Sequence, residues 1–139
     1  MSKVRVAVIG IGYLGEFHAQ KYQANKNAEL VAIVDTNRSR RDTISKKLGV
    51  KSYSAYKSII NEVDAVSIVV PTNLHYKVAS FFISNNKHVL IEKPFASSVL
   101  EAKKLKKLVS KKDIVLQIGH LERFNKAFVK LKNIVKNPV

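Results

Sequence analysis

Residues 3–15 read Lys3-Val4-Arg5-Val6-Ala7-Val8-Ile9-Gly10-Ile11-Gly12-Tyr13-Leu14-Gly15, a β-like run that ends in a GxGxxG turn. In such a turn Gly10 allows a tight bend, Gly12 lets the backbone approach a pyrophosphate, and Gly15 lets the next helix pack close to the strand. The N-terminus of that helix offers unpaired N–H groups to the phosphates. The stretch therefore predicts a dinucleotide-binding turn that includes Tyr13 and Leu14, although three glycines can also mark an ordinary turn.

A second apolar run, residues 29–34, leads into an acidic residue, Asp35. Asp35 lies 20 residues after Gly15, the separation expected for a carboxylate that binds the adenine-side ribose. Because a carboxylate repels a 2′-phosphate, we expect NAD in preference to NADP. The alternative is that Asp35 only caps the turn that it forms with Thr36 and Asn37.

Three arginines complicate the choice of cofactor. Arg38, Arg40 and Arg41 follow Asp35 closely, and any of them could reach a 2′-phosphate. NADP is therefore disfavoured without being excluded. Thr36 and Arg38 join Asp35 among the expected cofactor contacts.

The composition is that of a single domain. With 139 residues, of which 46% are hydrophobic and 25% charged, the chain can bury one core but not two large ones. No apolar run approaches the ~20 residues of a bilayer span, and residues 1–3 do not begin a signal peptide, so we expect a cytoplasmic protein with no membrane partner. Cysteine is absent, and the four histidines show no metal-binding pairing, so we expect no metal.

The net charge of +15 raises the hypothesis of nucleic-acid binding, because a basic face attracts phosphate backbones. Most of the basic residues, however, are lysines on the polar faces of predicted helices. In residues 101–112, for example, Ala102, Leu105, Leu108 and Val109 form the buried stripe and the lysines face water. We therefore favour a solvated surface and expect no specific nucleic-acid partner.

Apolar strand-like runs alternate with helical patterns along the chain. Strands are expected at 3–9, 29–35, 51–53, 65–70, 88–91 and 114–118, and helices at about 13–24, 39–48, 56–60, 72–84, 101–112 and from 122 onward. Thr72 or Asn73 is expected to cap the helix that follows Pro71. The alternation predicts an α/β fold with a doubly wound parallel sheet of the Rossmann type, in the strand order 3-2-1-4-5-6.

This strand order brings three segments to one crevice, between the carboxyl ends of the first and fourth strands. The expected cofactor contacts there are Gly10, Gly12, Tyr13, Leu14, Gly15, Val70, Pro71, Thr72, Asn73, His75, Glu92, Lys93 and Pro94. Lys93 is the candidate catalytic residue, because a lysine beside a nicotinamide can stabilise a developing alkoxide. The alternatives are a surface lysine before a turn proline and, for His75, a packing role in the first turn of a helix.

Four motifs in order, GIGYLG, VVPTNLH, IEKPFA and QIGHLERFNKAF, resemble the nucleotide-binding half of the glucose–fructose oxidoreductase and inositol dehydrogenase family, Gfo/Idh/MocA. The resemblance covers essentially the whole chain, and EKP is its most specific part. Residues 119–125 look most like the branch that oxidises the 3-hydroxyl of UDP-N-acetylhexosamines and their uronates. Such relatives usually have proline where this chain has Lys126.

The resemblance implies that a sugar or nucleotide-sugar hydroxyl gives hydride to NAD while a proton leaves to a base and Lys93 assists at the reacting oxygen. It also implies substrate contacts at His120, Arg123 and Asn125. In the family the general base is a histidine of a second, mostly β domain. We expect residues 1–120 to form the dinucleotide-binding domain and residues 121–139 a terminal helix and tail that in relatives leads to that substrate domain. The substrate domain itself is expected to be absent from this chain.

The last helical segment carries a wide apolar stripe. Its members are Phe124, Ala127, Phe128, Leu131, Ile134 and Val135. An uncovered stripe predicts fraying, partner binding or self-association, whereas the alternative is that it docks on the edge helices of the sheet.

Two main hypotheses of function remain. The first is the NAD-binding domain of a sugar oxidoreductase, inactive on its own, and the second is a non-catalytic NAD-binding module or gene relic. The sequence leaves open whether the chain is an enzyme by itself.

Overall fold

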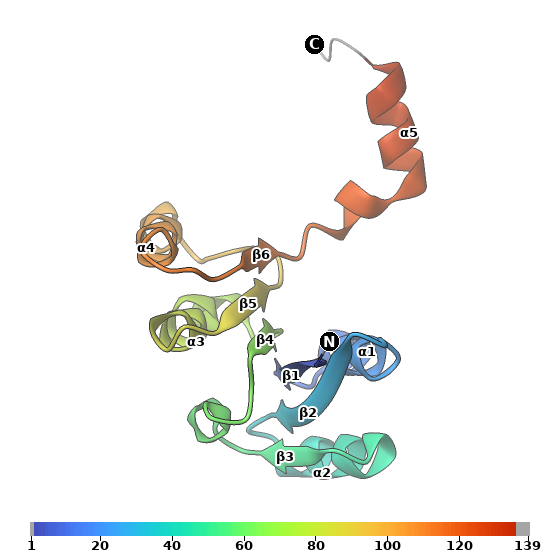
Figure 1. Cartoon of the computed structure of the whole chain (residues 1–139), viewed down its shortest axis with the longest axis vertical. Coiled ribbons are helices and arrows are strands. Elements are labelled where there is room, and N and C mark those ends of the chain that lie inside the picture. Colours follow the sequence, from blue (N-terminus) through green and yellow to red (C-terminus); the bar gives the residue numbers. More distant parts are fainter. Residues whose placement is uncertain (1, 136–139) are drawn as a thin grey trace.

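One parallel sheet organises the part of the chain that the structure describes, residues 2–135 (Figure 1). This computed structural model has six strands in the order β3-β2-β1-β4-β5-β6 within those residues. The strands are β1 (Val4–Ile9), β2 (Ala28–Val34), β3 (Lys51–Tyr53), β4 (Ala65–Ile68), β5 (His88–Ile91) and β6 (Leu116–Ile118). All neighbouring strands pair in parallel. The predicted fold class and strand order are therefore confirmed.

Helices cover both faces of the sheet. They are α1 (Tyr13–Gln23), α2 (Arg38–Leu48), α3 (Thr72–Ser84), α4 (Val99–Val109) and α5 (Lys126–Ile134), with 3₁₀ turns η1 (Tyr56–Ile59) and η2 (Leu121–Phe124). In Figure 1, α3 and α4 lie on one side of β4 and β5, and α1 lies on the other side, beside β1. Within residues 2–135, no helix is both long and apolar enough to span a lipid bilayer.

The central strand β1 shows why the strand segments of this sequence are mostly apolar. In β1, Ala7 and Ile9 belong to a core cluster that includes residues of α3 and α4, while Val8 belongs to a second cluster with residues of α1 and α2. Successive side chains of a strand point to opposite faces, so the part of a strand that is covered on both faces is mostly apolar, as β1 is from Val6 to Ile9. The two clusters thus lie on opposite faces of one sheet.

Two strands are shorter than predicted. β4 ends at Ile68 because its neighbours β1 and β5 end at the same level, so Val69 and Val70 continue past the edge of the sheet. At the start of β6, the Val115 N–H donates to the His88 imidazole, and pairing with β5 begins at Leu116. The apolar residues beyond these edges were expected to be strand and are loop.

The start of α3 also differs from the prediction. Neither Thr72 nor Asn73 caps the helix, because Thr72 is already its first residue and Pro71 occupies the capping position. The carbonyl of Pro71 accepts from the Leu74 N–H. Proline has no N–H of its own, and its φ of −53° directs the chain into the first turn.

The predicted continuous helix from residue 122 is wrong. The chain forms the short turn η2, extends at Asn125 and then begins α5, because the Asn125 side chain accepts from the Ala127 N–H as an N-cap. Figure 1 shows α5 projecting away from the sheet, so its stripe does not dock on the edge helices. The exposed fractions of Phe124 and Ile134 are 72% and 68%.

Candidate functional site

The three glycines of the turn after β1 differ in the space around them. Gly10 has a φ of +89°, and a Cβ there would lie 2.5 Å from the Val69 carbonyl oxygen. At Gly15 a Cβ would collide with the Gly10 carbonyl oxygen, so only glycine lets α1 pack this close to the strand end. A Cβ at Gly12 would meet nothing within 4 Å. Two glycines are therefore required by the protein itself, whereas Gly12 opens onto free space.

That free space is a cavity of about 710 Å³ at the carboxyl ends of the strands. Predicted residues that line it are Gly10, Gly12, Tyr13, Leu14, Gly15, Asp35, Thr36, Val70, Pro71, His75, Glu92 and Lys93. The predicted residues Arg38, Thr72, Asn73, Pro94, His120, Arg123 and Asn125 do not line it. The structure thus brings together the three expected segments, and the role of each residue stays a prediction.

Asp35 links the glycine turn to the end of β2. Its Oδ2 accepts from the Ile11 N–H at 2.8 Å, and its Oδ1 accepts from the Asn37 N–H at 2.8 Å. The second bond is the turn-capping contact that the sequence offered as an alternative role. A carboxylate oxygen can accept more than one hydrogen bond, so these contacts leave Asp35 able to accept from a ribose hydroxyl as well.

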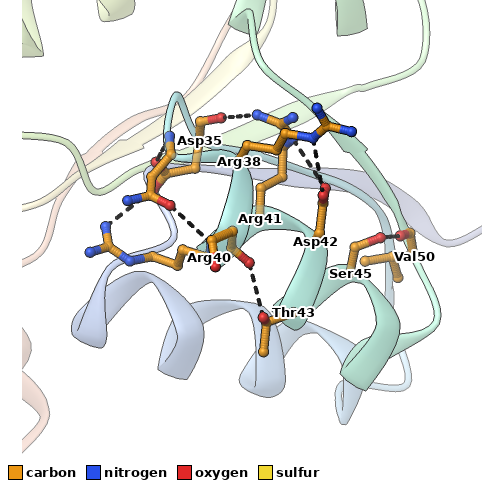
Figure 2. A network of polar contacts seen from close by, with 10 residues as sticks. Asp35, Arg38, Arg40, Arg41, Asp42, Thr43, Ser45 and Val50 are labelled. Carbon is orange, nitrogen blue, oxygen red and sulfur yellow. Dashed lines mark hydrogen bonds and ion pairs between the residues drawn. The ribbon is translucent and has the colours of Figure 1, made fainter.

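The three arginines after Asp35 have different surroundings, as Figure 2 shows. Arg38 is largely exposed and pairs with Asp42 at 3.6 Å, and Arg41 donates to the Asp35 carbonyl oxygen at 2.8 Å. Arg40 lines the cavity, with its Nη1 3.8 Å from the Asp35 Oδ2. Of the three, Arg40 is therefore the one placed to meet a 2′-phosphate.

At the other end of the cavity, His75 joins two loops. His75 is 1% exposed, with its Nδ1 2.9 Å from the Pro94 carbonyl oxygen and its Nε2 2.9 Å from the Val70 carbonyl oxygen. These contacts agree with the packing role, one of the two alternatives, and because His75 also lines the cavity its role toward a cofactor stays a prediction. Lys93 is exposed and lines the cavity, and the Lys93–Pro94 peptide bond is cis.

Glu92, the residue before Lys93, has a buried carboxylate. The Glu92 Oε2 accepts from the Lys93 N–H at 3.1 Å, and the Glu92 Oε1 lies 3.1 Å from the Nε2 of His18. Burial lowers the pKa of His18, and the Glu92 carboxylate opposes this shift in part. Sequence reasoning did not select His18, since no local motif points from α1 to the end of β5.

Other residues of the cavity were also missed. They are Ile9, Val34, Asn37, Ser54, Tyr56, Val69, Lys77 and Val78. Arg40, one of the three arginines considered for a 2′-phosphate, and Leu74, within the expected segment 70–75, also line the cavity. Two signals could have found several of them. Ser54 and Tyr56 follow β3, which the predicted order places beside β2, and Leu74, Lys77 and Val78 share one helical face at spacings of three and four.

The three predicted substrate contacts lie outside this cavity. His120 and Arg123 are exposed around η2. Asn125 is occupied locally, since its amide donates to Glu122 at 2.8 Å and its oxygen caps α5. Their roles toward a substrate stay predictions.

Comparison with known proteins now identifies the family. The model of the GFO_IDH_MocA oxidoreductase family, which has an NAD-binding Rossmann fold, matches residues 4–120. The chain belongs to this family. The predicted family is confirmed, and so is NAD as the cofactor of its Rossmann domain.

Individual relatives agree with this assignment. A UDP-N-acetylglucosamine 3-dehydrogenase of Acidithiobacillus ferrooxidans is 39% identical over 132 residues, which cover 95% of this chain and 42% of that protein. Its solved structure matches with a TM-score of 0.89 at 38% identity, over 96% of this chain and 44% of that one. A myo-inositol 2-dehydrogenase of Thermotoga maritima is 34% identical over 137 residues, or 96% of this chain and 41% of that protein. The chain thus spans about two fifths of the length of these relatives.

Proposed function

We propose that the chain is the cofactor-binding domain of an oxidoreductase that acts on a hydroxyl of a sugar or nucleotide-sugar. The observation that supports this proposal best is the cavity that runs from Asp35, past the glycine turn, to Lys93. Its lining fits an extended dinucleotide: a carboxylate at one end, a helix N-terminus in the middle and a lysine at the other end. NAD bound there supplies the hydride acceptor.

The middle of the cavity suits a pyrophosphate. No side chain caps the N-terminus of α1, so its first N–H groups remain available to an anion. Gly12 keeps the space in front of them clear. Tyr13 and Leu14 supply backbone N–H groups, and Asp35 accepts from the adenine-side ribose at the neighbouring strand end.

The Lys93 end is assigned to the chemical step. The ammonium group of Lys93 donates to the substrate oxygen and stabilises the negative charge that develops there as the hydroxyl proton leaves to a general base of the substrate domain; that charge passes into the new carbonyl bond when hydride leaves carbon. In this proposal residues 121–139 lead toward a substrate domain, and His120, Arg123 and Asn125 of this chain contribute to the sugar site. The UDP-N-acetylglucosamine 3-dehydrogenase relative makes a UDP-N-acetylhexosamine the first substrate to test.

A glycine substitution tests whether NAD occupies the cavity. Gly12→Ala adds a methyl group that touches no protein atom but enters the space assigned to the pyrophosphate. We expect NAD affinity to fall about tenfold or more, since a steric clash there removes several contacts. The free energy of unfolding should change by less than about 1 kcal/mol. Titration calorimetry and urea unfolding measure the two quantities.

Lys103→Ala, on the helix α4 away from the cavity, is the control for nonspecific effects. The proposal fails if wild-type protein gives no binding heat with millimolar NAD or NADP. It also fails if Gly12→Ala binds as tightly as the wild type. For the domain alone we expect no NADH from NAD and UDP-N-acetylglucosamine, because its residues include no assigned general base; turnover would contradict that part.

A further inference from the structure

Three side chains from distant parts of the sequence form a buried polar cluster behind the Lys93 end of the cavity. His18 comes from α1, Ser67 from β4, and Glu92 follows β5. The His18 Nδ1 lies 2.7 Å from the Ser67 hydroxyl, and the His18 Nε2 lies 3.1 Å from the Glu92 Oε1. The side chains of His18 and Glu92 are only 12% and 6% exposed, and Ser67 is fully buried. Polar groups in such a place need mutual partners.

The carboxylate determines where the proton of the ring lies. A carboxylate only accepts, so the Nε2 atom that faces Glu92 must carry the hydrogen. The Ser67 hydroxyl then donates to the bare Nδ1 of a neutral ring. The opposite tautomer would direct a lone pair of His18 at the negative Glu92. A doubly protonated ring keeps the Nε2 contact and adds a full charge, so both stable states attract Glu92.

Glu92 in turn is confined from its other side. A Cβ at Gly119 would lie 2.7 Å from the Glu92 Oε1 and 2.9 Å from its Oε2, so only glycine leaves room for the carboxylate. Within residues 2–135, the Oε1 atom is the buried side-chain oxygen that lacks a partner with full hydrogen-bond geometry. His18 is its nearest polar neighbour by the 3.1 Å contact. The Oε2 atom holds the Lys93 N–H.

We propose that His18 is a positioning residue that acts through Glu92. By attracting the Oε1 atom, His18 orients the carboxylate so that Oε2 fixes the backbone of Lys93 at the end of the cavity opposite Asp35. The inference rests on the proposed function, which assigns this end to the nicotinamide. It predicts that disturbing His18 affects recognition of the nicotinamide half of NAD and spares the ADP-ribose half.

Two variants disturb Glu92 from opposite sides. His18→Leu removes both ring nitrogens, and Gly119→Ala pushes the carboxylate away by sterics. For each we expect NAD affinity to fall about fivefold, because the Lys93 backbone is no longer held in one position, while affinity for ADP-ribose stays within about twofold of the wild type. His18→Gln, whose amide nitrogen can replace Nε2 as the donor, should restore NAD affinity. His88→Gln, at the opposite end of β5, is the matched control.

A pH titration separates positioning from simple packing. The ionisable groups that face His18 are Glu92 and, through Ser67, Tyr22, whose pKa is raised by burial. In ¹⁵N-labelled protein, the Lys93 amide resonance should shift with the titration of the His18 ring. That shift should vanish in His18→Gln, which keeps the donor but does not titrate. If the His18 ring only filled space, its titration would not change the Lys93 amide resonance.

The outcomes also separate this inference from the proposed function. If wild-type protein binds neither NAD nor ADP-ribose, the proposed function fails. If wild-type protein binds both and His18→Leu weakens neither, or weakens both equally, the positioning role of His18 is wrong. A Lys93 resonance that ignores the His18 titration overturns it as well. ADP-ribose binding by each variant shows directly that the variant is folded.

Discussion

The two ends of the cavity are built in different ways. At the Asp35 end, the carboxylate is held by the backbone of its own turn and by the glycine turn, and the half-exposed Arg40 lies beside it. At the Lys93 end, Glu92 and His75 are buried and depend on groups from distant segments. The first end is a short motif at a fixed spacing, and the second is a product of tertiary structure. Mutations should therefore act locally at the first end and through intermediaries at the second.

The largest effect on stability is expected at Gly10, in the glycine turn between the two ends of the cavity. Gly10→Ala forces a side chain into a φ of +89° and places its Cβ 2.5 Å from the Val69 carbonyl oxygen. We expect a loss of about 2–4 kcal/mol in the free energy of unfolding, because backbone strain and a backbone clash add. Urea unfolding followed by circular dichroism measures it.

Gly49→Ala is the matched control for this prediction. Gly49 ends α2 with a φ of +66°, but a Cβ there meets nothing within 4 Å. The strain alone should cost about 1–2 kcal/mol. Equal losses in the two variants would mean that the contact with Val69 does not constrain the glycine turn.

A smaller effect is expected at the Asp35 end. Asp35→Ala removes the carboxylate that we propose to accept from a ribose and to repel a 2′-phosphate, and it leaves Arg40 without its nearby negative partner. The ratio of NAD to NADP affinity should fall about tenfold, equivalent to ~1.4 kcal/mol. Titration of the variant with both cofactors measures this ratio.

Asp42→Ala separates the ribose role from a general loss of negative charge. Asp42 pairs with Arg38 at 3.6 Å and with Arg41 at 3.8 Å, and it does not line the cavity. Its removal should leave the affinity ratio unchanged. An unchanged ratio in Asp35→Ala would limit Asp35 to its turn-capping role.

The same contrast explains what the sequence could predict. The glycine turn, the Asp35 spacing and the strand order follow from local patterns and the geometry of parallel sheets, and these give the fold and the position of the cavity. Local patterns failed where tertiary contacts decide. The carboxylate at position 92 meets His18 and the space at Gly119 only because β5 lies between β4 and β6.

The prediction for the terminal segment was wrong for a different reason. Its apolar spacing continues through Asn125, so periodicity alone predicted one helix. The Asn125 side chain instead caps α5 and stops η2, a competition between side-chain and backbone hydrogen bonds that periodicity does not include. The exposed apolar stripe on α5 keeps the prediction of self-association or partner binding open to a sedimentation measurement.

The smallest effect is expected from acid, and it should be centred on His18. Burial lowers the pKa of His18 in the folded chain, so below about pH 6.5 the unfolded chain binds a proton that the folded chain resists. The free energy of unfolding should therefore fall as the pH drops from 7 to 5. Asp64 and Glu62 also have lowered pKa values, through bonds from Arg5 and Tyr53 respectively, but they titrate below their ordinary values of 3.8 and 4.5.

His18→Gln removes the titrating ring, so its free energy of unfolding should depend less on pH than that of the wild type between pH 7 and 5. His88→Gln should keep the wild-type dependence. Urea unfolding at four pH values in this range measures the slopes. Equal slopes in the wild type and His18→Gln would show that the ring is not a source of acid sensitivity.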